Sequence, residues 1–157
     1  MLFPDLPRAL AEMVRVTKVG GRALMVVYGP PAEVEFLGFF IRAMLTADPD
    51  FRGLPTDPPP LEFQVADPDK LHREMARAGL QDIELETVAE ELEFGSGSGL
   101  WHWVTNSNPI GGDMVAGITP NQKAVAQRTL DRMLDARAGR DDTAILGNLT
   151  HIAVGTK

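Results

Sequence analysis

The residues best suited to act on a small molecule are aromatic side chains and one histidine, which lie in two stretches of the chain. The stretch LWHWV places His102 between Trp101 and Trp103, and an earlier apolar segment contains Phe39 and Phe40. Aromatic rings can form an apolar pocket wall, and a histidine can serve there as a polar handle or a base. The alternative is structural, with both tryptophans packed in the core beneath a lid helix.

Few other residue types offer chemistry. The sequence contains no cysteine, which excludes thiolate nucleophiles, disulfides and cysteine-based metal sites. His72 lies in the charged stretch KLHRE and is expected to be solvated, and His151 is expected to pack within the last strand. Because the histidines are scattered and Glu90 and Glu91 lie on a solvated stretch, no metal site is predicted. The stretch RAGRDD, residues 137–142, is interpreted as a charged turn.

Length and charge limit the class of protein. At 157 residues and 44% hydrophobic content, the chain is predicted to form a single domain, residues 1–157, around one core. Its 15 basic and 22 acidic residues give a net charge of −7, which argues against binding to nucleic acids or anionic membranes. The start of the chain has no signal-peptide pattern, and no apolar run approaches the length of a membrane span. We therefore expect a cytoplasmic protein.

The first third of the chain predicts a helix, a strand and a second helix. Asp5 is a suitable N-cap, and the apolar spacing that follows predicts a helix ending near Thr17, with Gly20 or Gly21 in the turn beyond it. Residues 23–28, ALMVVY, show no polar alternation, which predicts a strand covered on both faces. Apolar residues in segment 33–46 cover more than one helical face and predict a helix with several packing partners.

The rest of the chain predicts a loop, two further helices and two strands. Proline-rich residues 47–60 predict a long surface loop. Asp67 and Gly79 bound a short predicted helix, and the capping box of Thr119 with Gln122 begins a longer one. Residues 82–94 predict a strand whose apolar side chains switch from one face to the other, which suggests a bulge or a break. GSGSG, residues 95–99, is interpreted as a flexible turn, and a last strand is predicted within residues 145–157.

The stretch ALAEMVRVTKVGGRALMVVYG resembles the second half of class I S-adenosylmethionine-dependent methyltransferases, in particular small-molecule enzymes similar to those of ubiquinone biosynthesis. Such enzymes carry R-V-L-K-P-G-G before their fifth strand, and residues 15–21 match except at Thr17 and Val19. ADPDKLHREMARAGLQDIELE resembles the helix and sixth strand that follow, and HIAVGTK resembles the seventh strand. The resemblance runs through nearly the whole chain.

The resemblance implies a partial Rossmann-like α/β fold that holds strands five to seven with their helices and lacks the N-terminal, cofactor-binding half. In the family, a glycine-rich loop and an acidic residue from that half hold S-adenosylmethionine, so this chain alone is expected to bind no cofactor. The segments after strands five and six build the family's substrate pocket, which implies substrate-binding roles for Phe39, Phe40, Trp101 and Trp103. His102 is the candidate base. Tyr28 ends the fifth strand at its carboxyl edge, where open α/β sheets bind ligands, and is a further candidate.

Three functions remain open at this stage. The chain could be a fragment or a shortened member of the methyltransferase family acting on a small molecule, a non-enzymatic binding or dimerisation module derived from that fold, or an unrelated α+β protein. Without a fourth strand beside it, the apolar strand at residues 24–28 would expose an open backbone edge. We therefore expect a two-fold homodimer in which this strand or the apolar helix at residues 36–45 forms the contact.

Overall fold

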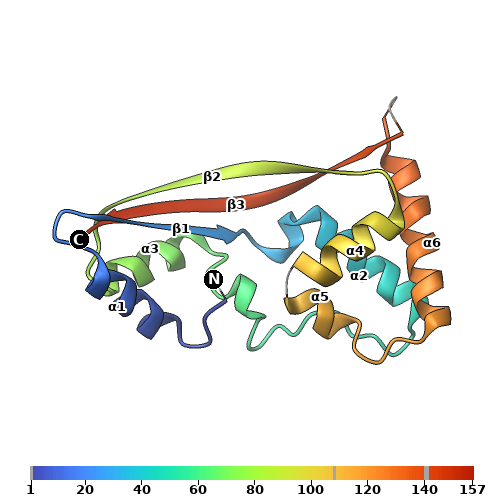
Figure 1. Ribbon diagram of the computed structural model, residues 1–157, viewed down its shortest axis with the longest axis horizontal. Coiled ribbons are helices and arrows are strands. Elements are labelled where there is room, and N and C mark those ends of the chain that lie inside the picture. The colour runs from blue at the N-terminus through green and yellow to red at the C-terminus, as the bar shows by residue number, and fades with distance from the viewer. Residues whose placement is uncertain (1, 108, 140–141) are drawn as a thin grey trace. The chain divides into compact units, whose positions relative to one another are not determined.

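The protein combines six α-helices with a three-stranded antiparallel sheet in the strand order β1-β3-β2, within the described residues (Figure 1). The structure is a computed structural model that describes residues 2–107, 109–139 and 142–157. In chain order, the elements are α1 (Leu6–Val16), β1 (Arg22–Tyr28), the 3-10 helix η1 (Pro31–Glu33), α2 (Glu35–Ala47), the 3-10 helix η2 (Leu61–Phe63), α3 (Pro68–Arg77), β2 (Gln81–Phe94), α4 (Gly97–Ser107), α5 (Pro109–Met114), α6 (Pro120–Arg137) and β3 (Ala144–Thr156).

Contacts within the chain divide it into two compact units. Unit 1 consists of Met1–Glu33, Pro58–Glu90 and Leu149–Lys157, and unit 2 consists of Val34–Asp57 and Glu91–Asn148. Two of the boundaries between the units, at 90/91 and 148/149, therefore fall inside the long strands β2 and β3. Each unit is described separately below.

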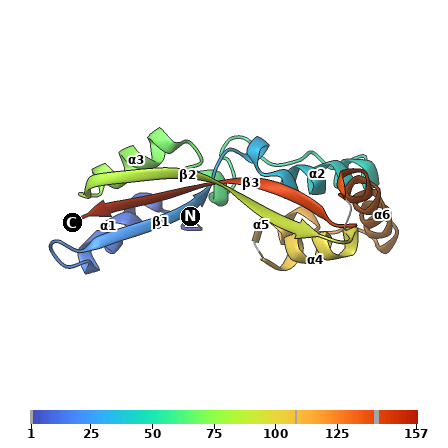
Figure 2. The same ribbon diagram turned by 90° about the horizontal axis from the view of Figure 1, so that it is seen from above.

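Unit 1 is a sheet with helices on one face. Residues 22–28 of β1 pair antiparallel with residues 150–156 of β3, and helices α1 and α3 lie beneath this part of the sheet in Figure 1. Seen from above, α1 lies on the side of β1 and α3 on the side of β2 (Figure 2). The apolar sides of these helices and strands form one buried core, which consists of Leu6, Leu10, Ala23, Met25, Val27, Val65, Leu71, Met75, Leu80 and Ala153. Burial of this apolar surface stabilises the unit.

The prediction that β1 is covered on both faces is wrong for this chain. Burial alternates along the strand: Met25 and Val27 are buried against the helices, whereas Leu24 and Val26 are 59% and 49% exposed. Side chains of a strand point alternately to its two faces, and within the described residues helices cover only one of them (Figure 1). β1 is the first strand in the order β1-β3-β2, so it lies at an edge of the sheet although its sequence has the uninterrupted apolar pattern of an inner strand.

The helix boundaries follow the capping residues of the sequence. Asp5 accepts a hydrogen bond from the Arg8 amide at the start of α1, and Asp67 accepts one from the Lys70 amide at the start of α3. Thr119 and Gln122 form the predicted capping box of α6. Gly79, at a φ of +99°, ends α3 in the left-handed conformation that glycine adopts most easily. These predictions are confirmed because capping depends on residues three positions apart.

Two predictions in the second half of the chain need correction. The segment at 82–94 belongs to one uninterrupted strand, β2, so the prediction of a break in it is wrong. The less exposed apolar residues do change parity along the strand, from Ile83 and Leu85 to Leu92 and Phe94. The stretch GSGSG is not merely a turn, because α4 already begins at Gly97. Ser96 caps this helix by accepting a hydrogen bond from the Gly99 amide at 3.1 Å.

Unit 2 is a cluster of helices around α2. Helix α2 packs against α4 and α6, and α4 also packs against α6 and α5. As the sequence predicts, α2 is buried on several sides, at Phe36, Leu37, Phe40, Ala43 and Met44. None of the helices in the described part of the chain has the length and apolar character that crossing a bilayer requires.

Candidate functional site

Three of the residues predicted to bind substrate, Phe40, Trp101 and Trp103, take part in ring contacts within unit 2. The ring centroids of Phe40 on α2 and Trp101 on α4 lie 5.1 Å apart, and those of Phe36 and Trp103 lie 4.6 Å apart in an edge-to-face arrangement. Such pairs add stabilisation beyond the area they bury. Phe40 and Trp101 are buried, whereas Phe39 and Trp103 are partly exposed. Phe39 and Trp103 therefore each keep some ring surface that a ligand can reach.

His102 lies on the exposed side of α4. Its Nδ1 atom lies 3.1 Å from the side-chain nitrogen of Asn106, one helical turn further on. An amide nitrogen is a donor, so Nδ1 accepts this bond and the ring proton resides on Nε2, which leaves Nε2 as a donor to solvent or ligand. Asn106 also donates to the His102 carbonyl at 2.7 Å. The orienting group of this imidazole is therefore an amide and not a carboxylate.

Tyr28, the remaining predicted site residue, belongs to unit 1 and stands at the carboxyl end of β1. It packs against Phe63 of η2 with ring centroids 6.2 Å apart. Burial raises the pKa of Tyr28 above its ordinary value of 10.0, and the negative charges of Glu90 and then Glu62 raise it further. All three effects disfavour the phenolate. Tyr28 is therefore a neutral hydrogen-bonding group in an acidic environment.

The titration of Tyr28 provides a direct test of this environment. Because it is the only tyrosine of the chain, ultraviolet difference spectroscopy can follow it alone. We expect a midpoint above 10.0 in the folded protein and near 10.0 in urea, so the associated stability is present below pH 10 and declines as the pH rises through the folded pKa. Glu90→Gln should lower the folded midpoint, whereas Glu84→Gln, on the exposed part of β2, should not. A folded midpoint at or below 10.0 would refute the assignment.

Two polar residues of β3 flank this position. Thr150 is the cross-strand neighbour of Tyr28, and its buried hydroxyl makes no hydrogen bond within the described residues. His151 is buried on the other face, where its Nε2 atom lies 3.0 Å from the Ala66 carbonyl oxygen and its Nδ1 atom 2.8 Å from the Thr87 hydroxyl. A carbonyl can only accept, so Nε2 carries the proton and Nδ1 accepts from Thr87. His151 is thus a bonded core residue with both nitrogens engaged.

The glycine-rich stretch lies at a helix start, a position the sequence analysis had not assigned to it. The Gly97 amide donates to the Asp131 carboxylate of α6 at 2.6 Å. A Cβ atom at Gly97 would also collide with the α6 backbone at the Gln127 carbonyl and the Asp131 nitrogen. Helix N-termini attract anions, and here a carboxylate of the protein already fills that role. The glycines are therefore explained by close helix packing.

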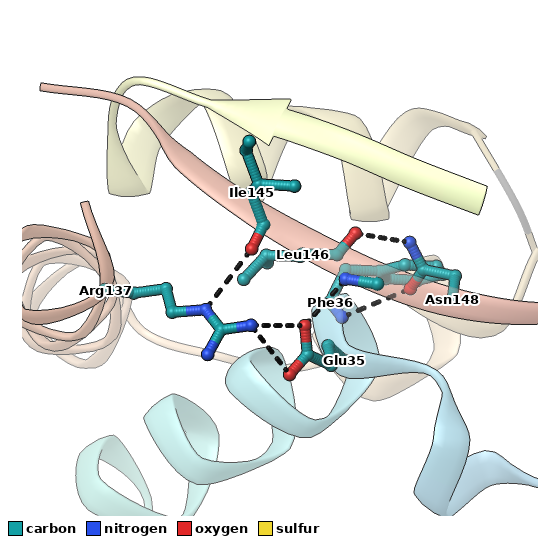
Figure 3. Close-up of polar contacts among 7 residues, drawn as sticks. Glu35, Phe36, Arg137, Ile145, Leu146 and Asn148 are labelled. Atoms are coloured by element: carbon teal, nitrogen blue, oxygen red, sulfur yellow. Dashed lines mark hydrogen bonds and ion pairs between the residues drawn. The ribbon is translucent and has the colours of Figure 1, made fainter. Parts of the chain in front are cut away.

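A polar cleft in unit 2 was not predicted from the sequence. Glu35 at the start of α2 faces Arg137 at the end of α6, and their closest charged atoms are 3.3 Å apart (Figure 3). The Gly147 amide donates to the same carboxylate at 2.6 Å, and Arg137 donates to the Ile145 carbonyl at 3.3 Å. The adjoining cleft has a volume of about 510 Å³ and is lined by Glu35, Glu91, Glu93, Arg137, Gly139, Thr143, Ile145 and Gly147.

The Glu35–Arg137 pair has a clear structural role. It connects α2 and α6 with β3, and buried Asn148 adds to this connection by donating to the Leu146 carbonyl and accepting from the Phe36 amide (Figure 3). Residues 102 positions apart form this pair, so no local pattern could reveal it. The charged turn predicted at 137–142 begins at this arginine, while its residues 140–141 lie outside the described part of the chain.

Neither metal ligation nor similarity to known proteins adds to this description. Among the described residues, no group of three or more histidine, aspartate or glutamate side chains could hold a metal ion. No protein-family model matches the sequence, and no curated protein matches it.

Proposed function

We propose that this chain is the substrate-side part of a class I S-adenosylmethionine-dependent methyltransferase fold that acts on a small molecule. The observation that carries the proposal is the order of the sheet. The C-terminal strand β3 lies between β1 and β2 and runs opposite to both (Figure 1). An inserted antiparallel last strand is how the seventh strand lies between the fifth and sixth in the fold that the sequence resembles. This agreement supports the interpretation of β1, β2 and β3 as strands five, six and seven.

The helices of unit 2 support the same proposal. They come from the two segments that follow β1 and β2, which build the substrate pocket in the family that the sequence resembles. Here these segments pack against each other through α2, α4 and α6, and their aromatic rings meet. Methyl transfer depends largely on alignment of acceptor and donor, so a pocket made of aromatic rings could supply much of the rate. In this proposal Phe39 and Trp103 contact a planar acceptor, Phe40 and Trp101 support them, and His102 is the candidate base.

A non-enzymatic binding or dimerisation module is the second candidate, and a specific observation favours it. The glycine-rich stretch GSGSG packs against α6, where the Gly97 amide donates to the Asp131 carboxylate and so does not face a cofactor. Within the described residues, no other glycine loop joins a strand to a helix in the manner of a cofactor site. In this second view the chain keeps acceptor binding without catalysis. Both candidates include a homodimer, because within the described residues no strand pairs with the outer edge of β1.

Calorimetric titration tests the two properties that both candidates share, an acceptor pocket and the lack of a cofactor site within this chain. We expect S-adenosylmethionine to bind the chain more weakly than about 10 μM, roughly −7 kcal/mol, and a planar aromatic acceptor such as naphthol to bind saturably. Phe39→Ala should weaken naphthol binding, whereas Leu45→Ala, an exposed residue of the same helix, should not. Cofactor binding at 10 μM or tighter would show that this chain holds its own cofactor site. Unchanged naphthol binding in Phe39→Ala would remove the proposed acceptor pocket.

A further inference from the structure

We propose that His102 presents a hydrogen-bond donor, and not a base, to the bound molecule, and that Asn106 is the positioning residue that fixes this role. Both residues lie on α4 in unit 2. The inference rests on the proposed function and narrows it, because the ligand becomes a planar aromatic molecule with an oxygen that accepts a hydrogen bond from Nε2 of His102.

The first step is the orientation of the Asn106 side-chain amide. Its nitrogen lies 2.7 Å from the main-chain carbonyl oxygen of His102, one helical turn earlier. A carbonyl oxygen can only accept a hydrogen bond, so an amide oxygen in the same place would be repelled. The nitrogen of the Asn106 amide, and not its oxygen, therefore faces His102.

The hydroxyl group of Thr105 supports the same orientation. It donates its single hydrogen to the Trp101 carbonyl oxygen, 2.9 Å away. The Asn106 nitrogen lies 3.2 Å from the Thr105 hydroxyl oxygen, which can accept because its own hydrogen is already used. Two acceptors from different residues thus agree on the position of the amide nitrogen.

The orientation of this amide fixes the proton of the His102 ring. Nδ1 of the ring lies 3.1 Å from the same amide nitrogen. A proton on Nδ1 would meet a hydrogen of the amide, so neutral His102 carries its proton on Nε2. Among the described residues, the one side-chain hydrogen bond of His102 is that at Nδ1. The hydrogen on Nε2 is therefore available to a ligand.

This arrangement disfavours the role of a general base. A base needs a ring nitrogen with a bare lone pair directed at the substrate. A carboxylate partner would hold the proton on Nδ1 and leave Nε2 bare, as in the histidine–aspartate pair of hydrolases. The Asn106 amide does the opposite, because it covers the lone pair of Nδ1 and leaves the proton on the accessible nitrogen.

The residue next to His102 defines the rest of the ligand. Trp103 is partly exposed, and successive residues of a helix project about 100° apart, so its indole and the His102 ring lie on neighbouring sides of α4. Edge-to-face contacts with Phe36 at 4.6 Å and Phe94 at 5.8 Å hold the indole in place. A flat aromatic molecule can lie against this indole while its oxygen meets Nε2. A carbonyl or carboxylate oxygen fits best, because it only accepts.

Nitrogen NMR of isotope-labelled protein tests the role of Asn106. At about pH 9, where an imidazole is neutral, we expect the proton of the His102 ring on Nε2. Asn106→Asp should move it to Nδ1, since a carboxylate only accepts. Gln81→Glu, the same change from amide to carboxylate at an exposed position of unit 1, should leave it on Nε2.

The His102 signals in these spectra are assigned from their absence in His102→Phe. Circular dichroism should show that every variant keeps the wild-type fold, because the substituted side chains are exposed. A wild-type ring protonated on Nδ1, or a ring that keeps its proton on Nε2 in Asn106→Asp, would overturn the positioning role of Asn106.

Calorimetric binding of a matched pair of naphthalenes at the same pH tests the donor role. Acetylnaphthalene carries a carbonyl oxygen where isopropylnaphthalene carries a methyl group, and the ratio of their affinities cancels the effect of a variant on the shared apolar part. We expect this ratio to shift against acetylnaphthalene by roughly three- to tenfold in His102→Phe, as loss of one hydrogen bond typically does. Asn106→Asp should shift it in the same direction, and Gln81→Glu should not change it.

The outcomes separate this inference from the proposed function. An unchanged ratio in both α4 variants, with both compounds still bound, would refute the donor role and leave the acceptor pocket intact. A ratio that changes in His102→Phe alone would refute the positioning role of Asn106. If neither compound nor naphthol binds the wild-type chain, the acceptor pocket and the donor role both fall, while the NMR experiment still decides whether Asn106 fixes the proton of the ring.

Discussion

Phe40→Ala is expected to lower the free energy of unfolding by about 3–5 kcal/mol, as removal of a fully buried phenylalanine typically does. Phe40 has no exposed surface and packs its ring against Trp101, 5.1 Å away between centroids. Its position on α2 places the resulting cavity among helices α2, α4 and α6, which pack against one another. Urea denaturation followed by circular dichroism measures the change.

Phe39→Ala provides the matched control for this substitution. Phe39 is the neighbouring residue on the same helix and has the same side chain, but it is only partly buried. We expect a loss well below that of Phe40→Ala, because the exposed part of the ring contributes little transfer free energy. Equal losses in the two variants would mean that α2 is not packed as described, and the aromatic pair would no longer support an acceptor pocket.

Gly97→Ala is expected to have the second large effect, again on the stability of unit 2. A methyl group at this position would meet the main chain of α6 at Gln127 and Asp131. Backbone atoms cannot rotate away as a side chain can, so α4 and α6 must separate, at a cost of about 1–3 kcal/mol or more. That cost exceeds the roughly 1 kcal/mol by which alanine favours a helix over glycine. The Gly97 hydrogen bond to Asp131 would also be strained.

Gly112→Ala is the control for this prediction. Gly112 lies in α5, is exposed, and has open space where a Cβ atom would stand. Here the helix propensity of alanine acts alone, so we expect unchanged or slightly higher stability in thermal unfolding. If Gly97→Ala also proved neutral, the close approach of α4 and α6 would be wrong, and GSGSG would again be open to a role as a ligand loop.

The amino-acid sequence alone determined the elements that depend on neighbouring residues. Asp5, Asp67 and the Thr119–Gln122 box fixed three helix starts, because a cap and the amide it binds lie within one helical turn. The several apolar faces of α2 predicted its burial. The aromatic candidates were found in the same way, since their residue types are visible in the sequence, although their pairing across α2 and α4 was not.

Only the tertiary structure decided the features that depend on distant residues. The sequence showed ALMVVY as apolar throughout, but whether the faces of β1 are covered depends on which elements lie beside it, and there Leu24 and Val26 are exposed. GSGSG has the composition of a flexible turn, yet the Asp131 carboxylate from α6 fixes its amide in a helix. The contact of Glu35 with Arg137 joins two helix ends that the chain separates by 102 residues. Such contacts arise from packing between elements, which a single sequence does not encode in any local pattern.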